Sequence, residues 1–327
     1  MAVSVMGDRA CGKTTFIGLL YAAQIEYTNN LVNKEAFKFT ADPHIAAYMG
    51  EMYNQLRIGR WPDATIKGHS SKISFLFGYK RTMGKAAQKM PLPSWISRRK
   101  WAKPYSTLQF CVYDVAGEDV QDIIRTPDGY LSEEIPDEAK DLLESRVLVF
   151  LIDAQKISAK VRSKAYMKMI NYDKEMATLI SLIASYNSKK TDPLQRKIYP
   201  VIVFTKFDMV PRSTLQDMGL PDTLPKVKDQ KARREYAETI MRRFYRQTLA
   251  YLKGGALKGV SFDEAAYIFS SVNTEFDEEQ GFESPKMKGD EVDYSYGEYA
   301  AFITHFRRIA NEMPDEIKEA QDFDTKW

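Results

Sequence analysis

The feature that most constrains this chain is a turn with two glycines, which lies between a short apolar run and a helical pattern near the N-terminus. Residues 2–6 form a β-type run, and from Thr14 to Tyr27 the apolar residues recur at helical spacing. The turn between them reads GDRACGKT and matches the pattern G-x-x-x-x-G-K-S/T at every fixed position. A strand, a glycine-bearing loop and a helix in this order predict a loop that binds phosphate groups.

The residue types of this loop suit phosphate binding for physical reasons. Gly7 and Gly12 let the backbone curl so that successive N–H groups point at phosphate oxygens. The helix that begins near Lys13 presents the positive end of its dipole, the lysine reaches the outer phosphates, and the Thr14 hydroxyl can ligate Mg²⁺. A glycine turn that matches by coincidence is the alternative. The nucleotide-binding residues predicted here are Gly7, Asp8, Arg9, Ala10, Cys11, Gly12, Lys13, Thr14 and Thr15.

The rest of the chain alternates strand and helix patterns. Arg146–Ala154 and Ile198–Asp208 are nearly continuous apolar runs, which fit strands covered on both faces by helices. Residues 163–187 between them are helical in pattern. This alternation predicts an α/β fold with a mostly parallel central sheet flanked by helices. The other expected elements are strands at Lys72–Phe77, Leu108–Val115 and Ala266–Val272, the last of the chain, and helices starting at Pro43 within 30–64, over about 226–252 and at Glu298–Glu312.

Composition narrows the classes of protein that remain. With 327 residues, of which 44% are hydrophobic, the chain can bury a substantial core, so wholesale disorder is excluded. No apolar run approaches the ~20 residues of a membrane-spanning helix, and the first residues lack a signal peptide's pattern. The net charge of +3 does not by itself indicate nucleic-acid binding. We therefore expect a cytoplasmic protein.

The cysteines fit a reducing compartment. There are only two, Cys11 and Cys111, too few for a disulfide framework. Cys11 lies beside Lys13 and a helix start, a setting that would lower the pKa of its thiol and make it sensitive to oxidation. The alternative is that Cys11 is simply a small residue that fits the loop.

Two later segments follow strands and bear on which nucleotide the loop would bind. Asp114 closes an apolar strand and Gly117 follows three residues later, so the aspartate can hold Mg²⁺ and the glycine N–H can meet a γ-phosphate. Thr205-Lys206-Phe207-Asp208 closes the strongest strand of the C-terminal half. A carboxylate there can accept two N–H groups of guanine, which adenine does not offer. Each pattern alone also fits a solvated turn, but their order and strand-end positions argue against coincidence.

Together these segments resemble the Ras-like P-loop GTPases. GDRACGKT resembles the family's phosphate loop, DVAG its D-x-x-G switch element and TKFD its guanine reader, N/T-K-x-D. Ser270-Ser271-Val272 is similar to the weaker S-A-K element, in which the middle residue, here Ser271, turns its N–H to the guanine oxygen. Thr65 stands where the family's first switch has a threonine that ligates Mg²⁺. The resemblance covers about residues 2–272, but only through these short motifs.

The resemblance implies a set of site residues. Nucleotide binding would extend from the phosphate loop to Gly117, Thr205, Lys206, Asp208, Ser270 and Ser271. The Mg²⁺ ligands would be Thr14, Thr65 and Asp114. The catalytic candidates are Lys13, Glu118 and Arg60.

The catalytic candidates depart from the family pattern. Glu118 occupies the position at which many members have a glutamine that orients water. A carboxylate can accept a proton from water but cannot donate a hydrogen bond to the phosphate, so hydrolysis would be slow or would need another residue. Arg60 is a candidate internal arginine finger, as in α subunits of heterotrimeric G proteins, although an ordinary surface arginine of the connecting loop is the favoured alternative. Val272 replaces the usual lysine of the last element.

The resemblance implies a molecular switch that hydrolyses GTP to GDP with Mg²⁺ and works with a protein effector or regulator. A different class stays open because the glutamine is absent: a nucleotide-bound scaffold or adaptor with little intrinsic hydrolysis. A nucleotide kinase is a more distant alternative, since it would leave TKFD without a role. A single enlarged GTPase domain is expected over residues 1–312, followed by an acidic tail at 313–327.

Insertions would set this domain apart from a minimal GTPase, at about 30–64, 78–107 and 212–258. The second carries two tryptophans and many basic residues, a pattern that suits an anionic membrane surface, a nucleic acid or an acidic protein. Because it connects the two switch elements, GTP binding could reposition it. A loop packed on the domain with solvated charges is the alternative. The residues concerned are Lys80, Arg81, Lys85, Lys89, Trp95, Arg98, Arg99, Lys100, Trp101 and Lys103.

An acidic segment precedes the final helix. It could fold onto the basic insertion, or it could keep a loop solvated. Its acids are Glu275, Asp277, Glu278, Glu279 and Glu283.

Overall fold

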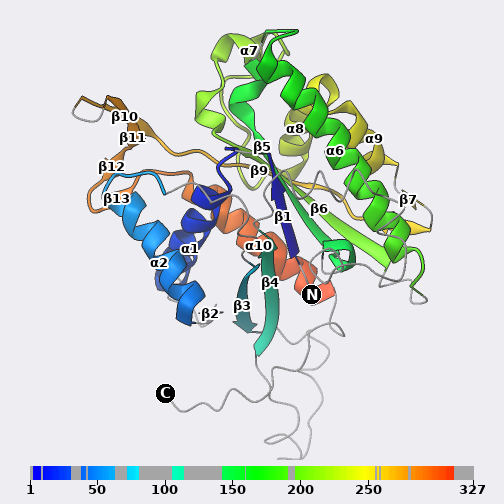
Figure 1. Ribbon diagram of the computed structural model, residues 1–327, viewed down its shortest axis with the longest axis horizontal. Coiled ribbons are helices and arrows are strands. Elements are labelled where there is room, and N and C mark those ends of the chain that lie inside the picture. Colours follow the sequence, from blue (N-terminus) through cyan, green and yellow to red (C-terminus); the bar gives the residue numbers. More distant parts are fainter. Residues whose placement is uncertain are drawn as a thin grey trace, which may run out of the picture.

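The chain is an α/β protein in which helices flank a mostly parallel central sheet (Figure 1), in agreement with the fold class expected from the sequence. This computed structural model describes most of the chain. The described residues are 3–8, 10–30, 38–41, 43–62, 72–80, 105–113, 142–158, 160–190, 196–254, 256–257, 259–278 and 281–312. No helix among them is both long enough and apolar enough to cross a membrane.

The central sheet is built around β5 (Val147–Asp153), which pairs in parallel with β1 (Val3–Gly7) on one side and β6 (Lys197–Thr205) on the other. β6 in turn pairs in parallel with β9 (Ala266–Phe269) and, at its first residues, with β8 (Val260–Phe262). The antiparallel strand β7 (Ala256–Leu257) ends the sheet. Because β1, β5, β6 and β9 run the same way, their carboxyl ends meet at one edge.

A second sheet is antiparallel and consists of β2 (Lys38–Ala41), β3 (Lys72–Lys80) and β4 (Tyr105–Tyr113). β4 lies alongside β1 (Figure 1). The sequence predicted β3 and β4 but not β2, which has only four residues. It also extended β4 to Val115, and Asp114 and Val115 lie outside the described residues.

The first face of the central sheet is covered by α1 (Lys13–Asn30) and α10 (Tyr296–Glu312), and α2 (Pro43–Arg57) packs against α1. Their buried side chains pack against alternate residues of the strands, among them Val149 and Leu151 of β5. Aromatic rings join two of these helices, since Phe16 of α1 lies 5.3 Å from the rings of both Tyr299 and Phe302.

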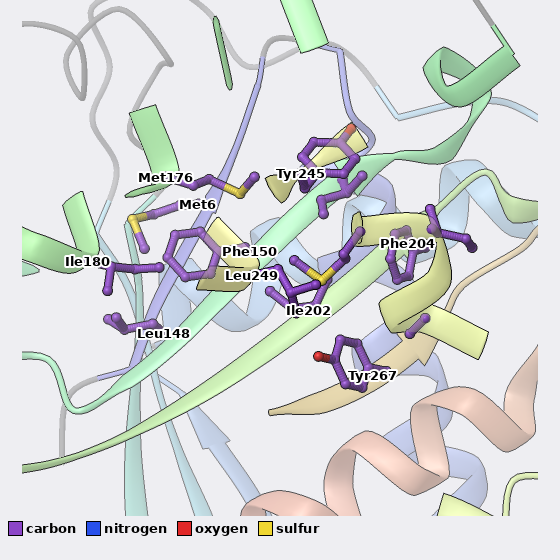
Figure 2. Close-up of a cluster of buried hydrophobic side chains, with 14 of the residues drawn as sticks. Met6, Leu148, Phe150, Met176, Ile180, Ile202, Phe204, Tyr245, Leu249 and Tyr267 are labelled. Atoms are coloured by element: carbon purple, nitrogen blue, oxygen red, sulfur yellow. The ribbon is translucent and has the colours of Figure 1, made fainter. Parts of the chain in front are cut away.

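The other face is covered by α6 (Lys164–Asn187), α8 (Gln230–Phe244) and α9 (Arg246–Lys253). Leu148 and Phe150 of β5 point into this cluster together with Ile202 and Phe204 of β6 (Figure 2). Both sets of β5 side chains are therefore buried, on opposite faces. This double coverage explains why the strand sequences are apolar at every position rather than at alternate ones.

One helix expected over about 226–252 is in fact two, so that prediction is wrong. α8 and α9 meet at Tyr245, whose φ of −131° and ψ of 50° are not helical. The Asp173 carboxylate of α6 accepts the backbone N–H groups of Gln247 at 3.1 Å and Thr248 at 3.0 Å, which caps the start of α9. The apolar residues keep helical spacing across the break because α8 and α9 bury the same side. The buried residues of that side are Tyr236, Ile240, Phe244 and Thr248.

The expectation that Ala266–Val272 is the last strand is also wrong. β9 ends at Phe269, and two hairpins follow it: β10 (Thr274–Asp277) with β11 (Phe282–Pro285), and β12 (Met287–Lys288) with β13 (Glu291–Val292). These strands are short and rich in charge, so they lack the alternation of apolar and polar residues by which a half-buried strand is recognised.

Short helical turns complete the described fold. They are the 3₁₀ turn η3 (Ala154–Ser158) after β5, the 3₁₀ turn η5 (Phe207–Met209) after β6, and the helix α7 (Arg212–Gln216). Two of them lie at the carboxyl edge of the sheet, where they follow the ends of β5 and β6.

Candidate functional site

The glycine-bearing loop of residues 7–14 connects the carboxyl end of β1 to α1, as the sequence predicted. Its two glycines are needed for different reasons. A Cβ on Gly7 would overlap Cys11 Sγ and lie 3.0 Å from the Leu151 Cβ, so only glycine allows this close approach. Gly12 has a φ of 87°, a left-handed conformation that side chains disfavour. Ala10 also has a positive φ, of 61°. The loop is therefore tightly curled.

The lysine of the loop folds back over it. Lys13 is the first residue of α1, and its Nζ donates to the Gly7 carbonyl oxygen at 2.9 Å. Thr14 and Thr15 follow in the first helical turn and are partly buried. The geometry agrees with the strand, loop and helix of the sequence prediction. Phosphate binding by the loop remains a prediction.

The TKFD segment touches this loop directly. The Thr205 hydroxyl lies 2.6 Å from the Cys11 carbonyl oxygen and 3.1 Å from that of Ile152. Lys206 donates from Nζ to the Ala10 carbonyl oxygen at 2.8 Å. β6 ends at Thr205, so the predicted strand was three residues too long, and the chain turns at Lys206, whose φ is 52°. Two segments separated by about two hundred residues thus share one edge of the sheet.

Asp208 lies beside the turn that follows β9. Its carboxylate accepts the backbone N–H groups of Asp208 itself and of Val272, and the Phe207 N–H donates to the Ser270 carbonyl oxygen at 3.1 Å. Desolvation raises the pKa of Asp208, although the side chain as a whole is exposed, and the two backbone hydrogen bonds oppose this rise. The structure therefore brings the TKFD and Ser270-Ser271-Val272 segments together.

The serines of that turn already have partners. The Ser270 hydroxyl lies 2.6 Å from the Tyr299 hydroxyl and is buried. The Ser271 N–H, which the resemblance would direct to a guanine oxygen, donates to Ser295 Oγ at 2.9 Å. Ser295 carries no motif signal, so sequence reasoning did not identify it.

The structure pairs two predicted residues, Asp8 and Lys206, with two that sequence reasoning missed, Lys156 and Asp153. We call these four residues the charge cluster. Lys156 of η3 places Nζ 2.5 Å from Asp8 Oδ2 and 3.9 Å from Asp153 Oδ2. Asp153, the last residue of β5, is 6% exposed and lies 3.2 Å from Lys206 Nζ. The charge cluster thus connects the phosphate-loop candidate to the ends of β5 and β6.

The expectation of a reactive Cys11 thiol is wrong. Cys11 is buried, and burial raises the pKa of its thiol to about 11. The positive charge of Lys13 lowers this pKa, but desolvation is the larger effect. Cys11 is therefore protonated at neutral pH and acts as a small packing residue, the alternative interpretation of the sequence.

Arg60 lies directly after α2 and its side chain is exposed. Its backbone N–H donates to the Gln55 carbonyl oxygen at 2.9 Å, and that of Gly59, whose φ is 71°, donates to Leu56 at 3.0 Å. These bonds form a Schellman cap that ends the helix. The local chain thus explains the position of Arg60 without reference to catalysis.

Several predicted site residues lie outside the described residues: Arg9, Thr65, Asp114, Gly117 and Glu118. Within the part of the chain that the structure describes, no group of three or more histidine, cysteine and acidic residues could hold a metal ion. Of the proposed Mg²⁺ ligands only Thr14 can be placed, in the first turn of α1.

The basic insertion also lies outside the described residues, apart from the ends of β3 and β4. Glu275, Asp277 and Glu283 of the acidic segment lie in the β10–β11 hairpin, whereas Glu279 lies outside the described residues. The chain around the two hairpins contacts the segment after α2, since Trp61 Nε1 donates to the Glu283 carbonyl oxygen at 2.7 Å and Arg57 Nε to that of Asp290 at 3.3 Å. These contacts place the hairpins beside α2.

The chain matches no protein-family model, and no curated protein is significantly similar to it in sequence. The fold and the arrangement of the loop therefore have to carry the functional argument.

Proposed function

We propose that this protein is a Ras-like GTPase that binds Mg²⁺·GTP at the carboxyl edge of its sheet and hydrolyses it to GDP. The observation that carries the proposal is the direct bonding between the phosphate-loop candidate and the TKFD segment, through Thr205 to Cys11 and Lys206 to Ala10. A phosphate-binding loop and a base-reading segment must share one edge to hold a single nucleotide.

The strand order supports the finer assignment. β3 and β4 are antiparallel, β4 lies alongside β1, and β5, β6 and β9 continue in parallel. This arrangement is similar to that of Ras-like domains, with β2 added beyond β3 and the hairpins β10–β13 inserted before the last helix.

Each residue of the proposed site has a role in this function. The loop N–H groups and Lys13 would hold the outer phosphates, with Lys13 exchanging its bond to the Gly7 carbonyl for phosphate oxygens. Asp208 would accept the guanine N–H groups and Lys206 would cover the base.

Thr14, Thr65 and Asp114 would hold Mg²⁺, whose chemistry is to neutralise charge that develops on the phosphates. Glu118 and Arg60 remain the proposed catalytic groups.

Competition binding tests the ligand. A fluorescent GTP analogue should bind in the presence of Mg²⁺ and be displaced by GTP at far lower concentrations than by ATP. Lys13→Ala should weaken binding by at least about a hundredfold, because charge-assisted phosphate contacts are lost. Lys231→Ala, an exposed lysine on α8, is the matched control and should not change it. Equal displacement by ATP would contradict guanine recognition.

Asp208 provides a sharper test of base recognition. Asp208→Asn should move preference from guanine towards xanthine nucleotides, because the altered base edge of xanthine suits an amide. Unchanged preference in this variant would remove Asp208 from the base site.

Single-turnover phosphate release tests the activity. Release should exceed that of a protein-free control and should stop when EDTA removes Mg²⁺. A rate equal to the control, with GTP demonstrably bound and a candidate partner present, would favour the nucleotide-bound scaffold over the switch.

The basic insertion 78–107 is the proposed contact with an anionic partner, either a membrane surface or a nucleic acid. Binding to vesicles with anionic lipid should weaken as salt rises. Hydrogen exchange across 78–107 should differ between the GTP-analogue and GDP states. Equal exchange together with no binding at low salt would overturn this assignment.

A further inference from the structure

The second residue of the phosphate-loop candidate is an acid, and its charge is opposed by a lysine from elsewhere in the chain. Asp8 Oδ2 lies 2.5 Å from Lys156 Nζ, and the two side chains are only 28% and 18% exposed. A pair this close and partly buried is screened less by salt than one at the surface. Lys156 belongs to no recognised motif, and 148 residues separate it from Asp8.

The position of Asp8 makes its charge matter. Lys13 Nζ, the group expected to meet phosphate, lies 2.9 Å from the carbonyl oxygen of Gly7, the residue directly before Asp8. The Asp8 carbonyl in turn accepts the Cys11 N–H at 3.2 Å. The Asp8 carboxylate is thus fixed to the loop that would hold a polyanion, where an uncompensated negative charge would oppose binding.

Lys156 is held in place to compensate that charge. It lies in η3, whose Ala154 and Ile157 are buried, and the Gln155 N–H donates to Asp153 Oδ1 at 3.2 Å. The buried Asp153 carboxylate lies between Lys156 and Lys206. The loop is therefore flanked by two lysines that share one buried acid.

We propose that Lys156 is a positioning residue of the phosphate loop, which neutralises Asp8 and so raises the affinity of the loop for the nucleoside triphosphate. This inference rests on the proposed function. The two aspartates 8 and 153 face the three lysines 13, 156 and 206, and the loop also contains Arg9, so the charges around the loop sum to a positive value. Loss of Lys156 lowers this sum by one charge and leaves Asp8 without its paired lysine, which should weaken GTP binding about three- to tenfold because the Coulomb attraction for the phosphates falls.

Four proteins test the inference by GTP-analogue titration at low salt: the unaltered chain, Lys156→Met, Asp8→Asn and the double variant. Charge neutralisation predicts weaker binding by Lys156→Met, equal or tighter binding by Asp8→Asn, and recovery to within about twofold in the double variant. If the loop needed the Asp8–Lys156 ion pair only to hold its conformation, all three variants would bind the GTP analogue more weakly, because none of them retains the ion pair. Lys160→Met, an exposed lysine four residues on, is the matched control for the lost charge.

Further measurements separate the outcomes. The deficit of Lys156→Met should shrink as salt rises, and its ratio of GTP to xanthine-nucleotide affinity should not change, since Asp208 is untouched. Tripolyphosphate as a competitor should follow the same order among the four proteins. Unaltered affinity of Lys156→Met, or a double variant as weak as Lys156→Met, would overturn the inference. Failure of the unaltered chain to bind GTP would instead overturn the proposed function.

Discussion

Charged side chains occupy two contrasting regions of this molecule, the charge cluster at the carboxyl edge of the sheet and the Arg233–Glu298 pair in its interior. At the edge, Asp8 and Lys156 keep contact with solvent. In the interior, Arg233 and Glu298 are 2% and 8% exposed. The edge pair can separate into solvent, whereas the interior pair cannot separate without leaving a bare charge buried.

The interior pair is surrounded by backbone partners. Glu298 of α10 accepts the Phe269 N–H at 2.9 Å, and Arg233 of α8 donates to the Pro225 carbonyl at 3.1 Å and to that of Tyr267 at 3.4 Å. The Arg233–Glu298 pair thus joins α8, β9 and α10 next to the turn at Ser270. The contrast shows that a pair in contact with solvent lies at the edge of the sheet beside the loop, whereas the buried pair joins elements of the framework.

The largest effect should come from breaking the interior pair. Glu298→Ala leaves Arg233 buried without its counter-ion and should lower the free energy of unfolding by about 3–5 kcal/mol. Glu298→Gln, which keeps an acceptor for the Phe269 N–H, should cost less. Urea denaturation measures both. If Glu298→Ala lowered the free energy of unfolding by less than about 1 kcal/mol, the buried pair would not differ in importance from the charge cluster at the edge.

A partly buried histidine tests how desolvation of an ionisable group affects stability. Burial lowers the pKa of His305 to about 4, against 6.5 in the unfolded chain, and among the described residues its buried Nε2 has no hydrogen-bond partner. The unfolded chain therefore binds the proton first, and stability falls as pH drops from about 6.5 to 4.

The expected loss over this range is about 2 kcal/mol, after allowance for partial exposure. The positive charge of Arg308 adds to the shift, while Asp263 and Glu312 oppose it. Denaturation at several pH values should show the loss, and His305→Met should flatten it. The lowered pKa of Asp263 costs stability mainly near and below pH 4. Because Asp263 is present in both proteins, the difference between them reports the histidine.

An interior carboxylate that caps a helix should matter less than the buried ion pair. Asp173→Ala removes the cap of α9 and should lower the free energy of unfolding by about 1 kcal/mol. Faster hydrogen exchange at Gln247 and Thr248, with little change in α8, would locate the effect at the helix start. Uniformly faster exchange would show instead that Asp173 stabilises the whole layer of α6, α8 and α9.

The smallest effect is expected from a surface pair. Arg234 contacts Glu264, which is 72% exposed, so Glu264→Ala should change the free energy of unfolding by less than about 1 kcal/mol. The change should fade at high salt. A loss as large as that of Glu298→Ala would contradict the difference drawn between buried and exposed pairs.

Much of the framework could be predicted from the sequence because its signals are local. The loop at 7–14 follows from two glycines between a strand and a helix, and the apolar runs of β5 and β6 record burial on both faces. The position of TKFD after a strong apolar run marked it as a candidate, and its Thr205 and Lys206 contact the loop.

Errors arose where distant residues decide the local conformation. Nothing in residues 226–252 indicates the break at Tyr245, because the cap comes from Asp173, more than seventy residues away. The hairpins β10–β13 were missed because they are short and charged. In Cys11 the neighbouring lysine and helix start suggested a lowered pKa, but burial outweighs both.

By itself, the sequence determined the alternation of strands and helices, the phosphate-loop pattern and the residues proposed to read the base, since each depends on neighbours within a few positions. Only the tertiary structure decided which charges meet. Asp8 and Lys156 are 148 residues apart, and Arg233 and Glu298 are 65 apart. The residues next to a carboxylate in the sequence do not indicate which cation it will pair with. The pairing depends on which strand ends and helices the folded sheet brings together.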